Sequence, residues 1–136
     1  MLACGPMDAA QALADLTEIS SQIEAAVLFD EQGEVQASTL ADVPARALAR
    51  AAADLLERAA AFRSDSVEVT QLEVSTRDGS VFVVRADPYR IAATTGPDPT
   101  VGLVFYDLKS CLRGAAAAAE PEKPKRRRAK EADGET

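Results

Sequence analysis

The sequence contains no histidine and no tryptophan, and its 136 residues include only two cysteines, Cys4 and Cys111. Zinc sites are built from cysteine and histidine, and a disulfide framework needs several cysteines, so neither is indicated. A cysteine nucleophile is not favoured, because there is no imidazole to act as its base. No glycine-rich phosphate-binding motif is present either. We therefore expect a protein that is not an enzyme, with no catalytic residue, no metal site and no small-molecule cofactor.

Long apolar runs and large side chains are also scarce. Aromatic residues make up 4% of the chain, whereas apolar residues make up 47%, many of them alanine. A chain of this length forms one core, here of small side chains and modest stability. No segment approaches the roughly 20 apolar residues that span a bilayer, and residues 1–7 lack the pattern of a signal peptide. We therefore expect a cytoplasmic protein without a membrane partner, in which Met7 is a second candidate for the native start.

The net charge of −7 is unevenly distributed. Residues 120–136 contain six basic and five acidic residues, so this tail carries +1 and the rest of the chain −8. An acidic body argues against nucleic-acid binding. The basic cluster at 123–130 could contact nucleic acid, an anionic membrane or an acidic partner, but the flanking acids nearly cancel its charge. A solubilising tail, disordered from about Glu120, is the favoured interpretation.

The first part of the chain predicts a helix followed by a hairpin. Asp8 and Gln11 form a capping box, in which each side chain binds a backbone amide at the helix start. Residues 25–29 then form a strand that is apolar on both faces and therefore central, and residues 34–39 form an outer strand beyond a turn at 30–33. The apolar stripe of the helix is expected at Ala9, Leu13, Leu16, Ile19 and Ile23.

A second helix and three strands follow. The helix starts at Asp42, with Pro44 in its first turn, and runs to about Phe62. Strands are expected at 67–74, 80–86 and 90–94. In the first of these, the apolar residues shift from odd to even positions, which a bulge near Thr70 or Gln71 would explain. Apolar residues on both faces make 80–86 central. The main buried stripe of the second helix is expected at Leu48, Ala51, Leu55, Ala59 and Phe62.

The segment after Thr100 fits a strand over a short window. A longer window shows helical spacing from Val101 to Leu112, so we predict a last helix, which the alanines at 115–119 can extend. The order is then α-β-β-α-β-β-β-α. This order predicts an α+β fold, in which helices cover both faces of a five-stranded, mostly antiparallel sheet.

This pattern resembles the roadblock (dynein light-chain) family in its prokaryotic form, with a profilin-like fold. The resemblance is carried by the hairpin at 27–35, the Ala-rich second helix, the strand pair around Asp78 and Gly79, and the closing segment 101–109. It covers about Asp8 to Arg113. The expected organisation is therefore an N-terminal extension at 1–7, a roadblock domain at 8–114, and a tail at 115–136.

The resemblance implies a homodimer, in which the third strands pair at the sheet edge and the second helices pack together. The residues are consistent with this dimer. An outer strand with Val67 and Val69 would otherwise leave an exposed apolar edge, and an Ala-rich helix permits close contact with a second helix. Val69→Asp is accordingly expected to lower the oligomeric state. The implied interface comprises Leu48, Ala52, Leu55, Val67, Val69 and Gln71.

Three arginines of the second helix, Arg46, Arg50 and Arg58, are the candidates for contact with a partner. Together with Asp54 they lie at i,i+4 spacing, so an exposed salt-bridge ladder is the favoured interpretation and a phosphate-facing arginine the alternative. The acidic residues Asp30, Glu31 and Glu34 fit turn chemistry better than acid-base catalysis. Cys111 is expected to be a buried, inert thiol.

The partners that the resemblance implies are Ras-like small GTPases, some family members stimulating hydrolysis and others acting as scaffolds. The leading hypothesis is therefore a homodimeric regulator or scaffold of such a GTPase. A profilin-like or PAS-like small-molecule sensor is one alternative, although it needs a pocket with inward polar groups. A purely structural subunit of a cytoskeletal or polarity complex is the other.

Overall fold

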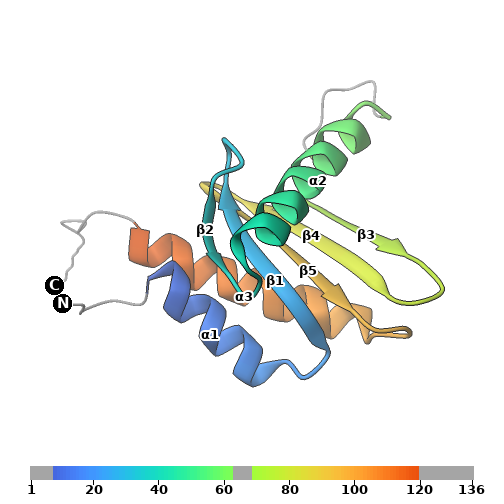
Figure 1. The fold of residues 1–136 in the computed structure, drawn as a ribbon, viewed down its shortest axis with the longest axis horizontal. Helices are drawn as coiled ribbons and strands as arrows, with labels where there is room; N and C mark the ends of the chain where they lie inside the picture. Colours follow the sequence, from blue (N-terminus) through green and yellow to red (C-terminus); the bar gives the residue numbers. More distant parts are fainter. Residues whose placement is uncertain (1–7, 63–68, 120–136) are drawn as a thin grey trace, which may run out of the picture.

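The computed structural model describes residues 8–62 and 69–119 (Figure 1). The predicted order of helices and strands is confirmed. The predicted disorder from Glu120 concerns residues outside the described ranges. The elements are α1 (Ala9–Ile19), β1 (Ile23–Asp30), β2 (Val35–Ser38), α2 (Asp42–Ala60), β3 (Gln71–Ser75), β4 (Ser80–Ala86), β5 (Tyr89–Thr95) and α3 (Val101–Ala119).

The strands form one antiparallel sheet in the order β2-β1-β5-β4-β3. The apolar strands β1 and β4 lie inside the sheet, as their composition predicted. The segment predicted as a short strand at 90–94 is the central strand β5, where Ile91, Ala92 and Ala93 are completely buried. The edges of the sheet are β2 and β3.

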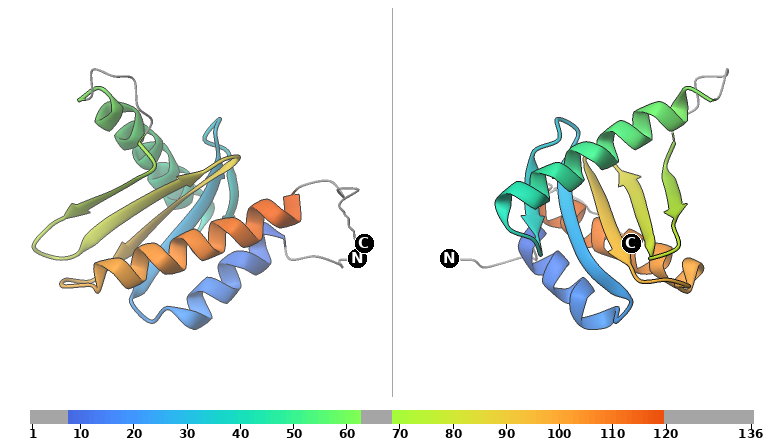
Figure 2. Two further views of the ribbon diagram at one scale, coloured as in Figure 1. Left: turned by 180° about the vertical axis from the view of Figure 1, so that it is seen from behind. Right: turned by 45° about the vertical axis from the view of Figure 1, so that its right-hand side comes forward.

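The helices lie on both faces of the sheet, with α1 and α3 side by side on one face and α2 on the other (Figure 2). Alternate residues of β1 divide between the two layers, since Leu28 packs towards α1 and α3 while Val27 and Phe29 pack towards α2. The structure is therefore the expected α+β fold. No helix in the described part of the chain is long and apolar enough to cross a membrane.

The predicted buried stripe of α2 is wrong. The residues that face the sheet are Ala45, Ala49, Ala52 and Leu56, whereas Phe62 is 89% exposed. At 3.6 residues per turn, the stripe that begins at Leu48 lies roughly a quarter turn from the buried one. Both stripes are apolar, and the sequence pattern alone favoured the one with larger side chains.

The ends of α1 and β3 also differ from expectation. The first helix stops at Ile19, whose side chain is 72% exposed, and Ile23 starts β1 instead of extending the helix. β3 starts at Gln71 and pairs with β4 without a register shift. Val69 and Leu72 nevertheless pack against the same cluster below α2. The predicted shift of the apolar residues from odd to even positions therefore lies between these two residues, before the regular pairing of β3 with β4 begins.

Gly79 allows two strands to approach closely at the turn between β3 and β4. A Cβ atom at this position would collide with the backbone carbonyl of Thr95 on β5. We expect Gly79→Ala to lower the free energy of unfolding by about 2 kcal/mol, because backbone must shift to relieve the overlap. Urea denaturation followed by circular dichroism would measure the loss.

Gly102 is the matched control, since it lies in α3 and a Cβ there would meet no atom within 4 Å. Gly102→Ala should change the free energy of unfolding by no more than about 0.5 kcal/mol, because position 102 lies in the first turn of α3 with open space around it. Equal effects of the two substitutions would contradict the close approach at Gly79.

Candidate interaction surfaces

One flank of α2 presents apolar side chains that its own subunit does not cover. Leu48 and Leu55 are only partly buried, and Ala51 is exposed. The helix packs mainly over β1, β2 and β5, so the α2-facing side of β3 and β4 is less protected. Val74 of β3 is accordingly exposed. An apolar surface of this kind is typical of a protein–protein interface.

The edge strand β3 continues this apolar surface. In the part of the chain that the structure describes, β3 is hydrogen-bonded to β4 on one side, and its outer edge offers backbone donors and acceptors to another strand. Leu72 and Val81 are partly buried beneath the same side. We call this area the α2–β3 surface; it comprises Leu48, Ala51, Leu55, Leu72 and Val74 with the outer edge of β3.

The predicted dimer residues do not all reach the α2–β3 surface. Leu48 and Leu55 belong to it, and Gln71 is exposed at the start of β3. Ala52 is 1% exposed and packs into the core of its own subunit, so it offers no surface to a second copy. Val69 also packs into that core; Val69→Asp would therefore disturb folding as well as pairing. Val67 lies outside the described residues.

Arg46 and Arg50 occupy the opposite flank of α2. Arg46 and Arg50 border an open groove of about 690 Å³ between α2 and the β1–β2 hairpin. Only the last step of the predicted ladder is formed within the described residues, with Nε of Arg58 2.9 Å from Oδ2 of Asp54. No partner in these same ranges holds Arg46 or Arg50 in an ion pair. These two guanidinium groups are therefore available to an acidic or phosphorylated partner.

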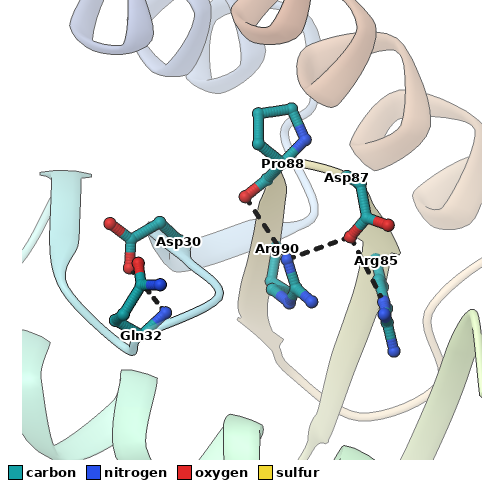
Figure 3. A network of polar contacts seen from close by, with 6 residues as sticks. All are labelled: Asp30, Gln32, Arg85, Asp87, Pro88 and Arg90. Atoms are coloured by element: carbon teal, nitrogen blue, oxygen red, sulfur yellow. Dashed lines mark hydrogen bonds and ion pairs between the residues drawn. The ribbon is translucent and has the colours of Figure 1, made fainter.

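The acidic hairpin between β1 and β2 has the turn chemistry that was predicted. Oδ1 of Asp30 accepts hydrogen bonds from the backbone N–H groups of Gln32 and Glu34, both at 2.9 Å. Gly33 has a φ of 84°, which glycine adopts at little cost. Figure 3 shows Asp30 folded over its own turn. This carboxylate shapes the hairpin, which is a structural role and not that of a general base.

A cluster of two arginines and one aspartate, which was not among the residues expected from the sequence, holds the turn between β4 and β5. Arg85 and Arg90 are cross-strand neighbours, and Oδ1 of Asp87 lies 3.5 Å from Nε of Arg85 and 3.2 Å from Nη1 of Arg90 (Figure 3). Nη1 of Arg90 also donates to the carbonyl of Pro88. The carboxylate compensates the buried Arg90 side chain. The sequence signal that could have indicated this cluster is the pair of arginines that flank Asp87 and Pro88.

Cys111 lies on α3 against α1. Its Sγ–H donates to the carbonyl of Ala12 at 3.5 Å. Burial, with a smaller contribution from the Asp15 carboxylate, raises the pKa of the Cys111 thiol to about 12. The thiol is therefore protonated at neutral pH and a poor nucleophile, as predicted. The described residues contain no cluster of three side chains suited to a metal ion.

The fold defines a class of small α+β domain, built on an open antiparallel sheet with helices on both faces. The chain belongs to the Roadblock/LC7 domain family, whose model matches residues 9–95. The match ends with β5, so it includes both elements of the α2–β3 surface. The family resemblance of the sequence is thereby confirmed. Comparison with curated protein sequences finds no significant match.

Several solved structures share this fold at low sequence identity. A Roadblock/LC7 domain from Streptomyces avermitilis superposes with a TM-score of 0.72 at 21% identity, covering 82% of this chain and 97% of that one. The gliding protein MglB from Thermus thermophilus gives 0.71 at 18% identity, covering 88% and 94%. Profilin II from Acanthamoeba castellanii gives 0.53 at 14% identity, covering 72% and 89%. These similarities support the roadblock and profilin-like fold.

Proposed function

We propose that this protein is a homodimer that regulates or scaffolds a Ras-like small GTPase and catalyses no reaction of its own. The α2–β3 surface is the observation that carries the proposal. It combines an apolar helix flank with a sheet edge, so a second copy satisfies both at once. The β3 edges pair into one continuous sheet, and Leu48 and Leu55 of the two copies pack together.

The position of the arginines supports a GTPase as the further partner. Arg46 and Arg50 lie on the flank of α2 that faces the β1–β2 hairpin, away from the α2–β3 surface. They therefore stay exposed when two copies pair through that surface. Guanidinium groups bind carboxylate and phosphate oxygens in paired hydrogen bonds, and both kinds of oxygen occur at the nucleotide face of a GTPase. Membership of the roadblock family adds to this support.

The experiment measures binding and GTP hydrolysis for each small GTPase encoded in the source genome, with and without this protein. An Arg46→Ala, Arg50→Ala double variant should bind the GTPase about tenfold more weakly, since it removes charged hydrogen bonds across the interface. Arg77→Ala is the control, because Arg77 is exposed in the distant β3–β4 turn. Its binding should equal that of the unsubstituted protein.

The hydrolysis rate distinguishes a regulator of the GTPase from a scaffold. A higher hydrolysis rate identifies a regulator, whereas binding at an unchanged rate identifies a scaffold or a structural subunit. Absence of binding to every small GTPase of that genome would contradict the proposal. The sensor alternative has less support, because such a site needs an enclosed pocket with inward polar groups, whereas the groove beside α2 is open to solvent.

A further inference from the structure

A second groove lies on the other face of the sheet, between α1 and α3. It has a volume of about 350 Å³. Leu16, Ile19 and Tyr106 supply its apolar walls, while Asp15, Asp107 and Ser110 supply polar atoms. Ile19 and Tyr106 are both largely exposed. The groove therefore combines an apolar lining with two carboxylates, on a face that the α2–β3 surface does not reach.

Asp107 is the unusual residue of this groove. It is only 8% exposed, yet within the described residues no side chain or backbone group forms a hydrogen bond or an ion pair with its carboxylate. Asp15 accepts one hydrogen bond from Gln11 at 3.0 Å. Arg113, further along α3, donates to the Ser110 hydroxyl at 3.1 Å. Asp107 is thus largely enclosed, its carboxylate lines the groove, and it is placed to pair with a ligand that carries positive charge.

The lining indicates what kind of cation fits. The acids of the groove do not form a cluster suited to a metal ion within the described residues, so a ligand with its own hydrogen-bond donors is favoured. A lysine or arginine side chain can lay its aliphatic stem along Leu16 and Ile19 while its charged head reaches Asp107. The ring of Tyr106 at the rim adds a surface that attracts cations. The groove is thus suited to a basic peptide segment.

We propose that the α1–α3 groove binds the basic segment 123–130 of this same chain. Its sequence, KPKRRRAK, contains six cations and no acid. The segment follows α3, which forms one wall of the groove, and the end of α3 lies beside the start of α1 (Figure 1). Charge complementarity and covalent attachment therefore both favour this occupant over a partner in solution.

The length of the chain permits this contact. Asp107 precedes Ala119 by 12 residues, which is about 18 Å along a helix. Residues 120–126 can span up to about 23 Å when extended. Pro121 and Pro124 disfavour continuation of the α3 helix. Arg126 is then the first arginine able to return to Asp107 of its own chain.

Zero-length carbodiimide cross-linking of the full chain tests the proposal, because it joins a lysine amine only to a carboxylate in contact with it. At low salt, mass spectrometry should find Lys123, Lys125 or Lys130 joined to Asp15 or Asp107. An equal mixture of isotopically light and heavy chains distinguishes contacts within one chain from contacts between chains. If the segment binds within its own chain, the cross-linked peptides should be light with light or heavy with heavy, and none should join a light chain to a heavy chain.

Two variants examine the role of charge. Asp107→Asn keeps the shape of the side chain and should reduce the links to Asp15 about fivefold, since it removes one of the two carboxylates that hold the segment. Replacing Arg126, Arg127 and Arg128 by glutamine should reduce the links to Asp15 and Asp107 to a similar extent. Asp42→Asn, on the exposed first turn of α2 across the sheet, is the control and should leave the links to Asp15 unchanged.

Three outcomes would overturn the proposal. Links to Asp15 and Asp107 could be no more frequent than links to the exposed Asp42, which would mean that the segment has no preferred site. Links between light and heavy chains would make the tail of a second copy the occupant. Links to Asp15 that Asp107→Asn leaves unchanged would remove the buried carboxylate from the interaction.

Discussion

Leu55→Glu should convert the proposed dimer into a monomer, with a dimer dissociation constant raised by about 100-fold or more. The partly buried Leu55 side chain lies on the uncovered flank of α2, where the proposed interface places it against the second copy. Burying one carboxylate per subunit against apolar atoms costs several kcal/mol, and each factor of ten corresponds to about 1.4 kcal/mol. Sedimentation equilibrium over a range of micromolar concentrations would measure the change.

Val43→Glu is the matched control for that experiment. Val43 is also an apolar residue of α2 and is 68% exposed, but it lines a separate open groove together with Arg46 and Arg50. The same change of charge should leave the dimer intact. A Leu55→Glu protein that keeps its circular dichroism spectrum and remains a dimer would contradict the interface, and so would an unsubstituted protein that is monomeric at every concentration.

Phe82→Ala is expected to have the largest effect on stability, lowering the free energy of unfolding by about 3–5 kcal/mol. Phe82 is completely buried between β4 and α3. Its ring meets that of Phe105 edge to face, with centroids 5.0 Å apart and planes at 78°. Because the surrounding core relaxes only partially after such a deletion, a cavity remains where the ring was. Urea denaturation would measure the loss.

Phe62→Ala is the matched control, because it deletes the same side chain from a position that is 89% exposed. The change in stability should stay within about 0.5 kcal/mol. Both substitutions are best measured in the Leu55→Glu background, so that dimer dissociation does not contribute to unfolding. A large loss at Phe62, or a loss below about 1 kcal/mol at Phe82, would contradict the observed core.

Most elements of the fold could be predicted, because their signals are local. Hydrophobic periodicity distinguished the last helix from a strand once the window extended to Leu112, and α3 indeed runs from Val101 to Ala119. Gly33 marked the first hairpin turn. The strand at 90–94 was recognised but not its central place, since short runs of alanine and isoleucine do not report which strands lie on either side.

The candidate surfaces were predicted less well, because α2 is apolar on two adjacent stripes. Periodicity finds both stripes but does not tell which one faces the sheet. Ala52 was therefore assigned to the interface although it is buried, and Phe62 to the core although it is exposed. The small side chains of Ala45 and Ala49 allow α2 to lie close to the sheet, and this packing turns the larger Leu48 and Leu55 outwards.

By itself, the sequence determined the order and type of the elements, the hairpin turns and the family, because these depend on neighbouring residues and on the periods of about 2.0 and 3.6 residues. The tertiary structure alone decided which stripe of α2 is covered, that Arg85 and Arg90 share Asp87, and that Asp107 lines the α1–α3 groove without a partner among the described residues. The physical reason is that strand order and helix packing bring together residues that are far apart in the chain. Local patterns contain no information about such contacts.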